Sequence, residues 1–163
     1  MKKLFVIFIA LALIMGITAC GNTNQYSENK TLSPDSSYAV ETEDIAEMKM
    51  SVKIGNKSFT ATLEDNAATR ELIEIMKEAP ISINMDDYSG FEKVGSLGRS
   101  LTADNQQMTT QAGDIVLYSG NQIVMFYGSN SWSYTKIGKI DDLSGWEDAL
   151  GNDSVTAVFS LIE

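Results

Sequence analysis

Short segments in which apolar and polar residues alternate are the feature that most constrains how this chain folds. Such alternation has the period of a half-buried β-strand. The first example, residues 48–54, is followed by the turn signal Gly55-Asn56-Lys57 and by a second alternating segment, residues 58–63. We therefore predict a β-hairpin at this point. Further strands are predicted at residues 81–85, 91–97, 114–118, 122–127, 134–140 and 155–161.

Polar segments between these strands are predicted to be turns and loops. Residues 86–90 read as a turn, residues 98–111 as a long loop, and residues 128–133 as a loop that carries Trp132. The acidic pairs Asp86-Asp87 and Asp141-Asp142 lack the spacing of an EF-hand calcium loop. We interpret them as solvated turn formers and expect no metal site.

One segment has the pattern of a long amphipathic helix. Asp65 or Asn66 can accept the free N–H groups of its first turn, and Pro80 ends it. On the exposed face we expect Arg70 to pair with Glu74 one turn later. The apolar residues that share one face are Ala68, Leu72, Ile75, Met76 and Ala79.

A second, shorter helix is predicted near the C-terminus. Ser144 and Glu147 have the S-x-x-E spacing of a capping box, and Gly151 stands where a C-terminal cap is expected. Many short strands, two helices and no βαβ alternation predict a mainly β fold. The expected architecture is an antiparallel barrel of about eight strands with two capping helices.

Residues 1–20 have the pattern of an export signal. Lys2 and Lys3 are followed by twelve apolar residues, too few for a membrane span of about 20 residues. Ile17-Thr18-Ala19-Cys20 resembles the lipobox of bacterial lipoproteins. We therefore predict that residues 1–19 are a signal peptide and that Cys20 is lipidated. The alternative is an ordinary signal peptide with a chance cysteine.

The segment that follows is polar, and the chain is acidic. Residues 20–46 hold few large apolar side chains, so we predict a flexible tether that precedes a folded domain over residues 47–163. Loss of the signal peptide leaves 10 Lys and Arg against 22 Asp and Glu, a net charge of −12. That charge argues against nucleic acid as a partner. The expected location is the outer, extracytoplasmic face of the cell membrane.

Missing residue types exclude several chemistries. The chain has no His, and its single cysteine, Cys20, is assigned to lipid. Ser–His–Asp and Cys–His catalysis, Cys/His zinc sites and His-ligated haem are therefore excluded. No phosphate-binding loop and no GxGxxG motif occur. We expect no bound cofactor, and we expect Asp114 to anchor a turn by hydrogen bonding.

Several motifs, taken in their order along the chain, resemble the bacterial cyclophilin-like domain family. The segment MKMSVKIGNKSFTATLEDNAATRELIEIM, residues 48–76, resembles the opening of that family's domain. The other matching motifs are MDDY (85–88), GFEK (90–93), QAGDI (111–115), LY (117–118), FY (126–127), YTKIGKID (134–141), LG (150–151) and the last strand. The resemblance covers about residues 48–159. It implies a closed eight-stranded barrel with a helix at each end.

True cyclophilins have a prolyl isomerase site, and the resemblance indicates where its residues would fall in this chain. That site contains an Arg, and a Gln within a Gln-x-Gly-Asp strand. Gln111 matches the Gln, but the Arg expected eight residues earlier falls on Ala103. Arg99 lies in the same predicted loop, out of register. Without the Arg, the donor that stabilises the twisted substrate carbonyl is missing, and Gln111 and Arg99 are the only catalytic candidates.

Aromatic residues supply a candidate ligand groove. We assign to it Tyr88, Gln111, Phe126, Trp132 and Tyr134. Phe126 lies in an apolar strand, which is also typical of a core residue. Trp132, within the polar sequence SNSWS, is the candidate that core packing explains least. An aromatic plug over the barrel is the alternative for Trp132.

Three functions stay open at this point. The first is a membrane-anchored binding module for a peptide or small molecule, suggested by the fold without the catalytic Arg. The second is a surface prolyl isomerase that uses Arg99. The third rests on family context, because related domains occur fused to flavodoxin-like domains and so suggest a redox partner. No residue pattern indicates bound flavin.

Overall fold

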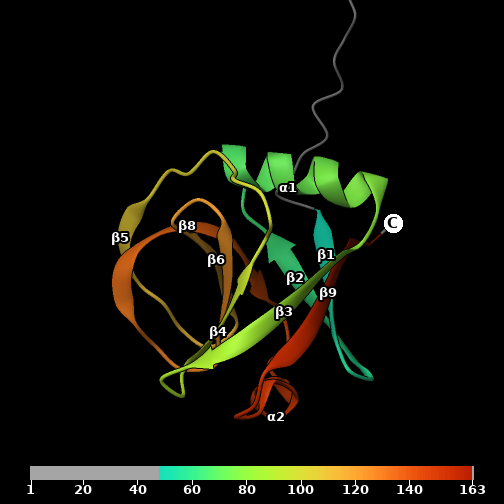
Figure 1. Cartoon of the computed structure of the whole chain (residues 1–163), viewed down its shortest axis with the longest axis vertical. Helices are drawn as coiled ribbons and strands as arrows, with labels where there is room; N and C mark the ends of the chain where they lie inside the picture. The colour runs from blue at the N-terminus through green and yellow to red at the C-terminus, as the bar shows by residue number, and fades with distance from the viewer. Residues whose placement is uncertain (1–47, 163) are drawn as a thin grey trace, which may run out of the picture. The chain divides into compact units, whose positions relative to one another are not determined.

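Nine β-strands and two α-helices make up residues 48–162, the part of the chain that the structure, a computed structural model, describes (Figure 1). The predicted signal peptide, Cys20 and the predicted tether lie outside the described residues. The strands are β1 (Lys49–Ile54), β2 (Lys57–Leu63), β3 (Ile81–Tyr88), β4 (Glu92–Ser96), β5 (Gln106–Thr109), β6 (Asp114–Tyr118), β7 (Gln122–Phe126), β8 (Ser131–Ile140) and β9 (Val155–Leu161). The helices are α1 (Ala67–Glu78) and α2 (Trp146–Leu150).

Eight of the strands form a closed antiparallel barrel. They follow one another around it in the order β2-β1-β9-β3-β4-β7-β6-β8. Pairing of β8 with β2, for example Ala61 opposite Ile140, closes the ring. β5 is an extra strand that pairs only with the first part of β8. The prediction of a mainly β, antiparallel barrel of about eight strands is therefore confirmed.

Apolar side chains fill the inside of the barrel. Met50, Val52, Ile115, Leu117 and Ile137 are all fully buried there. Alternate residues of each strand point inward, as the period of two in the sequence predicts. A void between the core residues leaves no space for a water molecule. A ligand therefore has to bind on the outside of the barrel.

The point of closure depends on a glycine. Gly138 of β8 lies opposite Leu63 of β2, and a Cβ atom at Gly138 would lie 2.5 Å from the Thr62 carbonyl oxygen. Real Cβ atoms do not approach backbone this closely, so any side chain here pushes β8 away from β2.

We accordingly predict that Gly138→Ala destabilises the fold. The expected loss is about 1–3 kcal/mol, the usual cost of overpacking a well-packed site. Urea unfolding followed by circular dichroism measures it. Lys53→Ala, at an exposed position of β1, is the control and should change the unfolding free energy by less than about 0.5 kcal/mol. Equal stability of Gly138→Ala and the wild type would contradict the account of closure.

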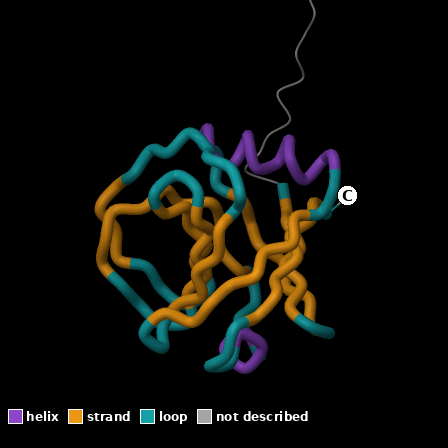
Figure 2. The backbone as a smooth tube through the Cα atoms, in the orientation of Figure 1, coloured by secondary structure: helices purple, strands orange, loops and turns teal. Residues whose placement is uncertain are grey.

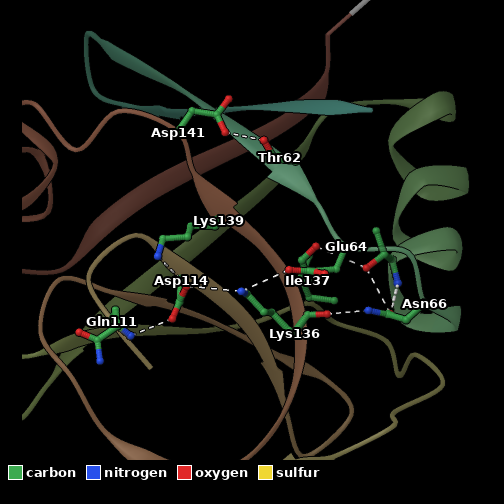
Figure 3. A network of polar contacts seen from close by, with 10 residues as sticks. Thr62, Glu64, Asn66, Gln111, Asp114, Lys136, Ile137, Lys139 and Asp141 are labelled. Carbon is green, nitrogen blue, oxygen red and sulfur yellow. Dashed lines mark hydrogen bonds and ion pairs between the residues drawn. The ribbon is translucent and has the colours of Figure 1, made fainter. Parts of the chain in front are cut away.

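Helix α1 begins at a side-chain cap that also ties it to the barrel. The Asn66 Oδ1 atom accepts the Thr69 N–H at 3.0 Å, and the Asn66 amide donates to the Lys136 carbonyl oxygen at 2.7 Å (Figure 3). The helix ends at Glu78, two residues before Pro80. The start and end of α1 were thus predicted correctly, with Asn66 rather than Asp65 as the cap.

The face of α1 that packs against the barrel differs slightly from the predicted face. It consists of Ala68, Thr69, Leu72, Ile73 and Met76. Ile75 is half-buried and packs against the core, as its place on the apolar face predicts, whereas Ala79 is exposed and its inclusion on that face was wrong. The predicted Arg70–Glu74 pair was also wrong. Arg70 bonds instead to Asp65 at 2.5 Å, because Asp65 lies beside the first turn of the helix.

Helix α2 lies at the opposite side of the strands from α1 in the view of Figure 2. Trp146 is buried, and its ring packs edge-to-face with the Phe59 ring, with the two centroids 4.9 Å apart. Its Nε1 donates to the Phe126 carbonyl oxygen at 2.8 Å. The predicted capping box was wrong. The N-cap is Gly145, with φ of 74°, and the helix starts one residue later than the box requires. Gly151 is the C-cap, as predicted. Within residues 48–162 no helix is both long and apolar enough to cross a membrane.

Three segments predicted as turns or loops are strands. Residues 86–88 continue β3 and pair with β4. Residues 106–109 of the predicted long loop form β5, and Trp132 lies within β8, opposite Met108. Polar composition misled the prediction here, because edge strands that face solvent have few apolar residues.

Candidate binding site

A second apolar cluster lies on the outer face of the barrel, separate from the core. It consists of Val116, Val124, Phe126 and Tyr134, with Phe91, Val94 and Met108 packed against it. Val116 alternates along β6 with the inward-pointing Ile115 and Leu117, so its side chain points outward. The same holds for Val124 and Phe126 on β7. This sheet is therefore apolar on both faces.

The first part of β8 helps to shape a groove over this outer face. Thr135–Lys139 of β8 pair with β6, whereas Ser131–Tyr134 pair with β5. The groove has a volume of about 510 Å³. Its lining residues come from β3, β4, β6, β7 and β8 with the turn before it, and are Tyr88, Glu92, Val94, Tyr118, Gln122, Asn130, Trp132 and Tyr134. We refer to this site as the outer groove.

Aromatic rings form much of the wall of the outer groove. Tyr134 is buried and contacts Phe126 beneath it and Tyr118 beside it, with ring centroids 5.7 and 6.0 Å apart. Its hydroxyl accepts the Asn130 amide at 3.0 Å, and burial raises the pKa of the phenol. Trp132 and Tyr88 are 56% and 58% exposed, which is unusual for side chains of this size.

Glu92 is the one charged residue in the lining. It is the first residue of β4 and lies opposite Tyr88 on one side and Phe126 on the other. The residue is only 6% exposed, so its carboxylate lies at the floor of the groove. The Oε2 atom has no hydrogen-bond partner among the described residues. Burial raises the pKa of Glu92 to about 7.

The structure brings together only part of the predicted groove. Tyr88, Trp132 and Tyr134 line it. Phe126 lies beneath it, fully buried against Tyr134. Gln111 is exposed and is not among the lining residues. That any of these residues contacts a ligand stays a prediction.

Sequence reasoning missed Glu92 and Tyr118 as site residues. A glutamate at the start of a polar strand looks like an ordinary surface residue, since burial by neighbouring strands is not visible locally. Tyr118 stands at the end of β6, just before the hairpin turn. Its alternation with the inward-pointing Leu117 was the available signal that it points outward.

The residues of the prolyl isomerase site are not assembled. Gln111 lies in a turn, where its backbone N–H donates to the Asp114 carboxylate at 2.8 Å (Figure 3). Asp114 thus anchors this turn, as predicted. Arg99 is exposed in the loop between β4 and β5, and Arg70 bonds to Asp65 at the start of α1. Among the described residues, no guanidinium is hydrogen-bonded to Gln111.

The acidic pairs are bonded within the chain. Asp86 accepts the Ser154 hydroxyl, and Asp141 accepts the Thr62 hydroxyl and pairs with Lys49 at 3.0 Å. Asp87 bonds to Lys93 at 2.8 Å, a hydrogen bond that lowers the pKa of Asp87. Asp86 and Asp87 lie in β3 rather than in a turn. Asp87 still accepts the Gly90 N–H of the turn that follows at 3.1 Å, so the interpretation as a turn former was wrong for Asp86 only.

A model of the cyclophilin-like family matches residues 52–160, a span from β1 to β9. The closed eight-stranded antiparallel barrel gives the fold class, and the family-model match gives the family within that class. The chain belongs to the cyclophilin-like family. Comparison with curated proteins gave no match.

Proposed function

We propose that this protein is a membrane-anchored extracytoplasmic lipoprotein whose cyclophilin-like barrel binds a peptide or small molecule without strong catalysis. The observation that carries the proposal is the outer groove. Its volume of about 510 Å³ falls within the roughly 300–1,000 Å³ typical of ligand pockets. Exposed aromatic side chains beside a few polar groups are also typical of binding surfaces.

The anchor in this proposal is Cys20. Residues 1–20 carry the sequence features of a lipoprotein signal, and two or three acyl chains give a stable anchor. The polar segment 20–46 would act as a spacer. A chain of that length spans about 30 Å as a random coil. In this arrangement α1 and α2 close the two ends of the barrel, and the outer groove faces the extracytoplasmic space.

Labelled palmitate tests the anchor. We expect the wild-type chain to incorporate the label and to sediment with membranes. Cys20→Ser should lose both properties while the barrel keeps its circular dichroism spectrum. Equal membrane association of wild type and Cys20→Ser would contradict lipid anchoring.

We expect no strong catalysis because the groove lacks the donor that would stabilise the substrate carbonyl. An isomerase needs a positioned cation or N–H group to stabilise the twisted carbonyl of its substrate. Arg99 is exposed and is not among the groove residues. The geometry therefore favours binding over rate enhancement.

Titration of the full chain in detergent with proline-containing peptides and small molecules tests the binding proposal. We expect the fluorescence of the exposed Trp132 to change on binding, while that of the buried Trp146 does not. Trp132→Phe is the matched variant for assigning the signal. A peptide isomerisation assay run in parallel should give the uncatalysed relaxation time of about 10–100 s. No binding across the panel, or a large rate enhancement, would contradict the proposal.

A further inference from the structure

The outer groove contains a buried carboxyl group that no residue within 48–162 neutralises. Glu92 is only 6% exposed as a residue, and its buried Oε2 atom is without a hydrogen-bond partner among the described residues. No lysine or arginine of residues 48–162 forms an ion pair with it. Lys93, its neighbour on β4, points to the other face and bonds to Asp87 and to the Asp153 carbonyl oxygen, both at 2.8 Å.

Burial of an unpaired carboxylate is unfavourable, and buried charges in proteins are normally paired. The titratable groups that line the groove beside Glu92 are phenols: Tyr88 from β3, Tyr118 from β6 and Tyr134 from β8. None of them carries a positive charge. Among the described residues Glu92 thus has no cationic partner, and a cation bound in the groove would supply one when the carboxylate is ionised.

The walls of the groove suit an organic cation. The rings of Tyr88, Tyr118, Trp132 and Tyr134 line it beside Glu92. Aromatic faces attract ammonium groups, and Trp is the strongest of them. A metal ion fits less well, because Glu92 is the only carboxylate in the lining and a single carboxylate does not satisfy a metal ion.

We propose that the outer groove binds an alkylammonium group, with Glu92 as its counter-ion and the aromatic side chains around its apolar part. This rests on the proposed function, in which the groove is the binding site. The ammonium group belongs either to a free amine or to a lysine side chain of a peptide. The net charge of −10 for the whole chain favours the approach of such a ligand.

The test uses the full chain in detergent and four probes. Choline and Nα-acetyl-lysine amide carry an ammonium group, 3,3-dimethylbutanol is the neutral isostere of choline, and an N-acetylated proline peptide without lysine has no ammonium group. Calorimetry and Trp132 fluorescence measure binding. We expect one or both cations to bind at least ten-fold more tightly than the isostere. Tighter binding of choline indicates a free amine, and tighter binding of acetyl-lysine amide indicates a peptide.

Two variants and one control identify the groups responsible. Glu92→Gln should weaken cation binding at least ten-fold and leave binding of the isostere unchanged. Trp132→Leu should weaken the binding of cations. Glu78→Gln, at the exposed end of α1, is the control and should match the wild type.

The pH dependence is a further readout. Cation binding requires the ionised carboxylate, so affinity should fall at least ten-fold from pH 8 to pH 5.5 in the wild type. In Glu92→Gln it should stay constant, because the variant has no ionisable group at position 92. If the isostere or the proline peptide binds as tightly as the cations, the ammonium proposal is wrong and the binding function stands. If none of the four probes binds, both are wrong.

Discussion

Glu92→Gln is expected to stabilise the protein at pH 8 by about 3 kcal/mol. The pKa of Glu92 is raised by burial from 4.5 to about 7 in the folded state. Between these values the folded state holds a proton that the unfolded chain has lost. The contribution of Glu92 to stability is therefore greatest below pH 4.5, and it falls as the pH rises to about 7. A glutamine at this position does not ionise, so its contribution to stability does not fall as the pH rises.

Urea unfolding from pH 4.5 to pH 8 measures this effect. The difference in unfolding free energy between Glu92→Gln and the wild type should be near zero at pH 4.5. It should grow to its full size above pH 7. Other carboxylates titrate in both proteins, so their contributions cancel in the difference. A difference that is constant over this range, or that favours the wild type at pH 8, would show that Glu92 is not a buried acid.

Asp87→Ala is expected to destabilise the protein by about 3–5 kcal/mol at pH 7, the usual result of leaving a buried charge without its partner. Lys93 is fully buried, and its ammonium group bonds to the Asp87 carboxylate at 2.8 Å. The Tyr127 ring lies 5.5 Å from the ammonium, and the Tyr127 hydroxyl donates to the same carboxylate. Loss of Asp87 removes the only carboxylate from this arrangement.

Lys93→Met should cost less than Asp87→Ala. The Asp87 side chain is 24% exposed, so water can solvate it once the cation is gone. It also keeps the Tyr127 hydroxyl and the Gly90 N–H as donors. Asp86→Ala is the control, because Asp86 bonds only to the exposed Ser154 hydroxyl, and should change stability by less than about 1 kcal/mol. Urea unfolding of the three variants measures the order of their stability losses. Lys93→Met losing as much as Asp87→Ala would contradict this account.

Much of the barrel could be predicted from the sequence because its strands obey a local rule. β1 and β2 alternate around the turn at Gly55, and β6 and β7 around Gly120, so each hairpin is visible in a few residues. The edge strand β5 was not visible, because Gln106–Thr109 have no apolar alternation and pair with β8 only through the tertiary fold. The start of α2 was missed because Gly145 takes a left-handed conformation that the S-x-x-E pattern does not reveal.

The site was harder to predict than the fold. Trp132 was predicted as a groove residue because core packing does not explain a large aromatic side chain in a polar segment, and Tyr88 was predicted with the other aromatic candidates. The importance of Glu92 could not be predicted, since it depends on which strands flank β4 in the barrel. Family resemblance drew attention to Gln111, whose backbone is held in a turn by Asp114. The resemblance indicates where the catalytic Arg of true cyclophilins would fall, and this chain has Ala103 at that position.

Chemical-shift mapping by NMR tests most directly the central claim that ligands bind in the outer groove. The full chain in detergent would be labelled with ¹⁵N and titrated with choline and, in a separate sample, with Nα-acetyl-lysine amide. We expect at least one of these ligands to shift the backbone N–H groups of Tyr88 and Glu92 and the indole N–H of Trp132, with Gln111 and Arg99 unchanged. Shifts concentrated at Gln111 and Arg99, with the outer groove unchanged, would contradict this claim.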